Sequence, residues 1–68
     1  DKDGLALSYN NLGNVYLSLR EYHQAYSFFQ KALNLKGNKS GVYFNLGIAS
    51  YESNNISEAL DFFEKSIR

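Results

Sequence analysis

The stretch YNNLGNVY at residues 9–16 is followed, 34 residues later, by the related stretch YFNLGIAS at residues 43–50. The similarity continues on the C-terminal side at the same spacing, without insertion or deletion. The identical pairs are Tyr9 and Tyr43, Asn11 and Asn45, Leu12 and Leu46, Gly13 and Gly47, Ala25 and Ala59, Phe28 and Phe62, Phe29 and Phe63, and Lys31 and Lys65. A fixed period in this range is the signature of a repeat protein, in which every repeat is one structural unit.

Apolar residues within each repeat recur at three- and four-residue steps, which is the spacing of one helix face. The four stripes are Leu5, Tyr9, Leu12, Tyr16 and Leu19; Tyr22, Ala25, Phe29, Ala32 and Leu33; Val42, Leu46 and Ala49; and Ile56, Ala59, Leu60, Phe63 and Ile67. The chain contains no proline that would interrupt them. The sequence therefore predicts four helices, two per repeat, and an all-α fold.

Local chemistry suggests where these helices begin. Asp3 and Ser40 are good N-cap residues for the first and third helices, because their side-chain oxygens can accept from free backbone N–H groups. Asn55, with Glu58 three residues later, resembles a capping box that opens the last helix at Ile56.

Helix ends are predicted from residues that tolerate a left-handed backbone. Gly37 lies where the second helix must stop, and Asn54 can end the third. Arg20 occupies the equivalent turn of the first repeat, where a left-handed conformation costs strain, so that turn is expected to close differently.

The spacing also resembles a known consensus. Tyr-x-x-Leu-Gly-x-x-Tyr at residues 9–16, followed by Ala-x-x-x-Phe-x-x-Ala at residues 25–32, is similar to the tetratricopeptide (TPR) repeat. The second repeat departs from it at Ser50 and Ser66, and Gly37 stands where the family usually has proline. The signature residues, expected in the core, are Tyr9, Leu12, Gly13, Tyr16, Ala25, Phe29, Ala32, Tyr43, Leu46, Gly47, Ala59 and Phe63.

This resemblance implies a right-handed α-solenoid of two helical hairpins, cut from a longer array. Residues 6–39 would form the first repeat and residues 40–68 a shorter second one. Residues 1–5 resemble the end of a preceding inter-repeat loop. The glycines and alanines of the signature are small where the two helices of a hairpin must approach closely.

TPR arrays resemble one another in binding proteins, with the first helix of each repeat lining a concave groove. The resemblance therefore implies a protein or peptide partner. Residues opposite the core stripe of those first helices are the candidates for the groove: Leu7, Asn10, Asn14, Leu17, Phe44, Asn45, Ile48, Tyr51 and Glu52. Their carboxamides can hydrogen-bond a peptide backbone, and their apolar side chains can form shallow pockets.

Asn14 and Asn45 also match two asparagines of the carboxylate clamp found in TPR co-chaperones. The clamp lysine of the first repeat, however, would fall at Asn10, and the basic pair of a third repeat is missing. The general groove is therefore the preferred interpretation.

Composition excludes several other functions. The chain has no cysteine and a formal net charge of zero, so neither thiol chemistry nor attraction to nucleic acid or anionic membranes is expected. His23 is the single histidine and lacks neighbours at metal-ligand spacing. We expect no enzymatic activity, cofactor or metal, and a cytoplasmic location.

Two alternatives remain open. The repeats could be the regulatory or sensor segment of a multidomain enzyme or transcriptional regulator. They could also self-associate through the last helix, which carries Leu60, Phe63 and Ile67 toward a side that a following helix would cover.

Overall fold

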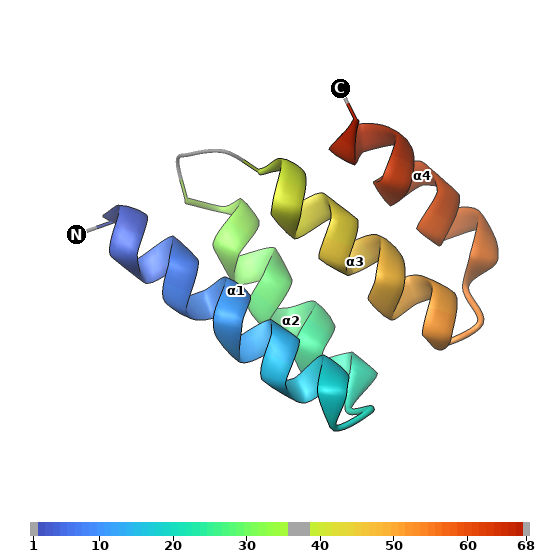
Figure 1. Cartoon of the computed structure of the whole chain (residues 1–68), viewed down its shortest axis with the longest axis horizontal. Helices are drawn as coiled ribbons and strands as arrows, with labels where there is room; N and C mark the ends of the chain where they lie inside the picture. The colour runs from blue at the N-terminus through green and yellow to red at the C-terminus, as the bar shows by residue number, and fades with distance from the viewer. Residues whose placement is uncertain (1, 36–38, 68) are drawn as a thin grey trace.

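The chain folds into four helices that form two hairpins, in a computed structural model that describes residues 2–35 and 39–67, with side chains from residue 4 onward. The helices are α1 (Lys2–Ser18), α2 (Tyr22–Leu33), α3 (Ser40–Glu52) and α4 (Ile56–Ser66). α1 packs along α2 and α3 along α4, and the hairpins meet mainly where α2 lies against α3 (Figure 1). The predicted all-α fold of two helical hairpins is confirmed.

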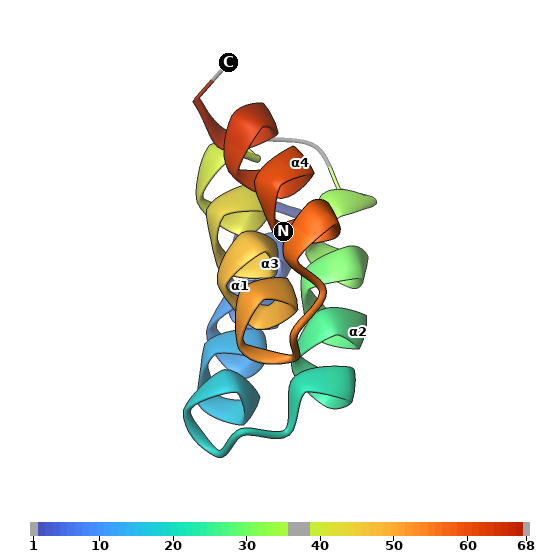
Figure 2. The same cartoon turned by 90° about the vertical axis from the view of Figure 1, so that its right-hand side faces the viewer.

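The two hairpins form a thin slab with extents of 34 × 28 × 14 Å. Seen along its long edge, α1 and α3 lie on one side and α2 on the other (Figure 2). Packed helices lie roughly 8–10 Å apart, so these dimensions leave room for only two layers. Each helix consequently keeps one face toward solvent.

The hydrophobic core lies between α2, α3 and α4. Phe29 of α2 and Leu46 of α3 are its largest fully buried apolar members, and both are 0% exposed. The other buried members are Ala25, Ala32, Val42, Ala49 and Phe62. Full burial of a Phe or Leu side chain contributes about 1.5–3 kcal/mol, so the contact between α2 and α3 is a major source of stability.

Two glycines bring the helices of each hairpin close together. Gly13 of α1 faces the ring of Phe29, and Gly47 of α3 faces the ring of Phe63. A Cβ atom added at either glycine would lie 2.6 Å from the Cδ1 atom of that phenylalanine, which is well inside van der Waals contact. The prediction that small residues are needed at these two positions is therefore confirmed.

Leu12 does not join the core as predicted. It is 41% exposed, whereas Leu46 at the equivalent position is fully buried. Leu46 packs into the cluster with residues of α2. The corresponding side of α1 faces no further helix in the described part of the chain. Tyr9 and Tyr16 of α1 are only half-buried.

The buried face of α4 also differs from the predicted stripe. Ala59 is buried as expected, but the large buried side chain is Phe62, against which the rings of Tyr26 and Tyr43 pack at centroid distances of 6.2 Å. Leu60 and Ile67 are 63% and 84% exposed. α4 contacts α3 along one side, and these two residues lie on the other faces.

The turns inside the two hairpins close in the same way, contrary to expectation. Arg20 and Asn54 both have a left-handed backbone, with φ of 63° and 71°. In each turn two backbone hydrogen bonds close a Schellman motif. They are Arg20 N to Leu17 O at 3.0 Å, Glu21 N to Tyr16 O at 2.9 Å, Asn54 N to Tyr51 O at 3.1 Å, and Asn55 N to Ser50 O at 2.8 Å. The bonds outweigh the left-handed strain that a side chain suffers at Arg20.

The predicted helix starts need correction. α3 begins at Ser40 with Lys39 as N-cap, so Ser40 is the first helical residue. Asn55 is the N-cap of α4 as predicted, but its side chain makes no capping hydrogen bond. The capping box is wrong as well, because the Glu58 carboxylate instead accepts a hydrogen bond of 3.2 Å from Ser50 Oγ.

The N-terminal region is helical where a loop was expected. α1 begins at Lys2, so residues 2–5 form its first turn and Asp3 lies inside the helix rather than at its cap. α2 ends at Leu33, with Asn34 as its C-cap. Gly37, where the second helix was predicted to stop, is one of residues 36–38, which lie outside the described part of the chain.

Replacing Gly13 with alanine should lower the free energy of unfolding by about 1–3 kcal/mol, because the buried ring of Phe29 has no space to move. Gly47→Ala should cost less, since Phe63 is half-buried and its ring can shift. Gly41→Ala is the matched control: nothing lies within 4 Å of its added Cβ. That change should be neutral or stabilising by up to ~1 kcal/mol. Urea unfolding followed by circular dichroism measures all three, and equal losses would contradict this packing.

Arg20→Gly should raise the free energy of unfolding by up to about 1 kcal/mol, because glycine adopts a left-handed backbone without a Cβ clash. Asn54→Gly should have a smaller effect, since asparagine already tolerates this conformation. Thermal unfolding of the two variants side by side makes the comparison. A larger gain for Asn54→Gly than for Arg20→Gly would show that strain at Arg20 is not significant.

Candidate partner-binding surface

The nine residues predicted for the groove lie on α1 and α3, the helices that share one layer of the slab (Figure 2). We call them the groove surface. The exposed members are Leu7, Phe44, Tyr51 and Glu52, and the half-buried members are Asn10, Asn14, Leu17, Asn45 and Ile48. Consecutive members on the same helix are three or four residues apart, or adjacent, so each helix presents them along one side.

A side-chain hydrogen bond joins the two halves of the groove surface. Asn45 Nδ2 of α3 donates to Asn10 Oδ1 of α1 at 3.0 Å. Both residues are partly buried, and α1 otherwise contacts α3 far less than it contacts α2. This bond brings the side of α1 that carries Asn10 next to the side of α3 that carries Asn45.

Other members of the groove surface have contacts outside it. Leu17 packs partly against the buried core cluster. The ring of Phe44 lies 5.6 Å from that of Phe63, so Phe44 sits toward α4. Glu52 Oε1 accepts a hydrogen bond of 3.3 Å from the Tyr22 hydroxyl of α2. These three residues therefore also serve packing, while Leu7 and Tyr51 are exposed and Asn14 is half-buried.

The chemistry of the groove surface is that of recognition. It offers carboxamide donors and acceptors beside exposed apolar side chains, with one carboxylate at Glu52. Within residues 2–35 and 39–67, no group of three or more His, Asp or Glu side chains is arranged to hold a metal ion. In the same described segments, no helix has the length and apolar character needed to cross a membrane.

The repeated lysines make contacts that their position in the sequence did not predict. Lys31 Nζ lies 5.7 Å from the ring centroid of Tyr9 and 5.2 Å from that of Phe28. Lys65 makes the same pair of contacts with Tyr43 and Phe62, at 5.7 and 5.8 Å. Each lysine thus covers an aromatic pair with a cation–π contact that joins the two helices of its hairpin. The recurrence of this lysine after 34 residues was the feature of the sequence that could have indicated this role.

Comparison with known families agrees with this architecture. A sequence model of the tetratricopeptide repeat family matches residues 4–68, which is nearly the whole chain. The chain therefore belongs to the tetratricopeptide repeat family. Repeats of this family are generally protein-interaction modules, so protein binding is the broad function that membership supports.

The chain is also similar to a curated protein of Guillardia theta that carries the name "Uncharacterized protein ycf37". The two are 33% identical over 63 residues, covering 93% of this chain. The aligned region is 35% of the relative, so the chain spans about a third of that protein's length.

A double-mutant cycle on Asn10→Ala and Asn45→Ala should give a coupling free energy of about 0.5–1.5 kcal/mol, the usual net contribution of a neutral hydrogen bond. Asn11, adjacent in sequence but exposed, provides the control cycle with Asn45 and should show no coupling. Equilibrium unfolding in urea measures both cycles. Equal coupling in the two would mean that α1 and α3 are not joined through this pair.

Proposed function

We propose that the groove surface binds an extended or helical segment of another protein, and that the chain acts as an adaptor rather than as a catalyst. The observation that supports this most directly is the hydrogen bond between Asn45 and Asn10, because it places the uncovered faces of α1 and α3 next to each other. The exposed Leu7 and Tyr51 would supply apolar contacts, and Asn14 a peptide-binding carboxamide.

The mixture of polar and apolar side chains on the groove surface favours modest affinity, and the small area of the chain limits the size of the partner segment. An interface of standard size buries roughly 800 Å² on each partner, and the whole chain exposes 4607 Å². Two hairpins therefore offer room for a short peptide or one helix. The same binding would serve a scaffold or the sensor segment of a larger enzyme or regulator, which remain alternative settings for it.

A second candidate function is self-association through α4. Leu60 and Ile67 are largely exposed, and burying such side chains against another copy would be favourable by about 1.5–3 kcal/mol each. This candidate uses a different face from the groove surface, so the two can be distinguished in one experiment.

Photo-crosslinking in cells that express the full-length protein tests the proposal. A photoreactive phenylalanine analogue is placed at position 14 on the groove surface, at position 60 on α4, or at position 27, an exposed serine of α2 that serves as control. Adducts to a different protein from position 14, and not from position 27, are expected. Adducts mainly from position 60 to a second copy would instead favour self-association.

Asn14→Ala should then weaken binding of the crosslinked partner by about fivefold or more, the effect of losing one contact of about 1 kcal/mol. Gln24→Ala, on the exposed part of α2, should leave the affinity unchanged. Isothermal titration with the isolated partner measures both. Loss of affinity in the Gln24 variant alone would overturn the assignment of the groove surface.

A further inference from the structure

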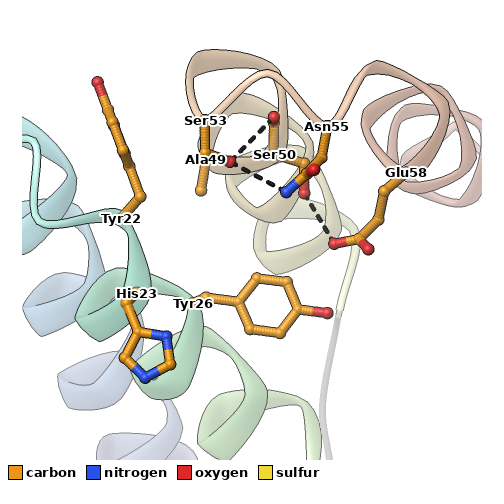
Figure 3. A pocket seen from close by; sticks show the side chains of 8 residues that line it. All are labelled: Tyr22, His23, Tyr26, Ala49, Ser50, Ser53, Asn55 and Glu58. Atoms are coloured by element: carbon orange, nitrogen blue, oxygen red, sulfur yellow. Dashed lines mark hydrogen bonds between the residues drawn. The ribbon is translucent and has the colours of Figure 1, made fainter.

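A pocket lies between the two hairpins, at a position where the second repeat has a small side chain in place of a large one. Tyr16 of α1 stacks on Phe28 with ring centroids 5.4 Å apart and an interplanar angle of 9°. The position 34 residues later is Ser50, which is 1% exposed and far smaller. A hollow of about 330 Å³ opens beside Ser50, between α2 and the end of α3 (Figure 3).

The pocket has aromatic walls and a carboxylate. It is lined by Tyr22, His23, Tyr26, Ala49, Ser50, Ser53, Asn55 and Glu58. Tyr22, His23 and Tyr26 project from α2 on one side, and Glu58 of α4 lies on the other side (Figure 3). None of the lining residues is a member of the groove surface, although Glu52 of that surface is hydrogen-bonded to Tyr22 of the pocket wall.

Glu58 is held in place at this site. Its Oε1 atom accepts a hydrogen bond of 3.2 Å from the buried Ser50 hydroxyl. No cationic side chain of the described residues forms an ion pair with Glu58, and its carboxylate keeps acceptor capacity for a ligand. The Tyr22 hydroxyl donates to Glu52 at 3.3 Å, which places a second carboxylate close to the aromatic wall.

The charge of the pocket follows from these groups. The last turn of α3 and the first turns of α2 and α4 all reach it, and their partial charges have opposite signs. These contributions partly cancel, so the full negative charge of Glu58 determines which ligands are attracted. A carboxylate that faces the Tyr26 ring is suited to a cation (Figure 3).

We propose that this pocket binds the guanidinium group of an arginine side chain presented by a partner protein. A guanidinium is planar and can lie against a tyrosine ring while its N–H fork reaches a carboxylate. It is also less strongly hydrated than a lysine ammonium, so less hydration is lost when it enters an open pocket. The pocket shares no lining residue with the groove surface.

The first test is an NMR titration of the ¹⁵N-labelled chain with blocked single residues at low ionic strength. N-acetyl-arginine methylamide should shift the amides of residues 22–26 and 49–58. N-acetyl-citrulline methylamide, its uncharged isostere, should bind up to about fivefold more weakly, since an exposed ion pair is worth up to ~1 kcal/mol. Equal binding of the citrulline compound, or of the matching lysine compound, would overturn the proposal.

Three variants test whether arginine binds at this pocket. Glu58→Gln keeps an acceptor for Ser50 but removes the charge, so arginine binding should fall by up to about fivefold while the spectrum remains that of a folded chain. Asp61→Asn removes an exposed charge from α4 outside the pocket and should change nothing. Ser50→Tyr restores the side chain found at the equivalent position of the first hairpin and should abolish binding. Full binding by Glu58→Gln would contradict the site, whatever the fate of Ser50→Tyr.

A final comparison separates a partner protein from a small molecule. Ethylguanidinium carries the same group without a peptide, and should bind more weakly than arginine placed within a short alanine peptide. If ethylguanidinium binds as tightly as that peptide, the ligand is a free guanidinium compound, and the assignment to a partner protein is wrong.

Discussion

The close approach of Gly13 to the ring of Phe29 sets the distance between α1 and α2, and the remaining packing depends on it. Because no Cβ atom stands in the way, the ring lies directly against the backbone of α1. The same ring belongs to the buried cluster that contains Leu46 of α3. One side chain therefore closes the first hairpin and holds the second hairpin against it. Gly47 and Phe63 repeat the contact in the second hairpin, where Phe63 is only half-buried.

Most of the fold could be predicted because the repeat period and the helical spacing are local features of the sequence. The structure differs from the prediction where the burial, backbone conformation or hydrogen-bond partner of a residue depends on contacts with the rest of the fold. Leu12 and Leu46 occupy the same position in equivalent stretches, yet one is exposed and the other buried, because α2 covers only Leu46. At Arg20, local preference argued against a left-handed turn, but the hairpin connection and its two hydrogen bonds impose it. At Glu58, local spacing suggested a helix cap, but the carboxylate instead accepts a hydrogen bond from the buried hydroxyl of Ser50 on another helix.

The candidate site was predictable to a similar degree. Helical spacing was enough to collect its residues on two faces, and the family resemblance suggested that these faces belong together. The bond between Asn10 and Asn45 could not be anticipated, since it depends on how closely α1 approaches α3. Ser50 was recognised as a departure from the consensus tyrosine. Its effect, a hollow rather than a local collapse, depends on Tyr26 of α2 and on the Glu58 side chain, which lie across the pocket.

The hydrogen bond between Asn10 and Asn45 spans 35 residues, about one repeat period, and the bond between Tyr22 and Glu52 spans 30. Contacts of this range make the chain close only moderate loops as it folds, and loop entropy rises slowly with length. In such a topology every added hairpin closes loops of the same size as the one before it. The entropic cost of ordering is then nearly constant per repeat. Arrays built on this pattern can therefore differ in length without a change in the loop entropy that each hairpin loses when it folds.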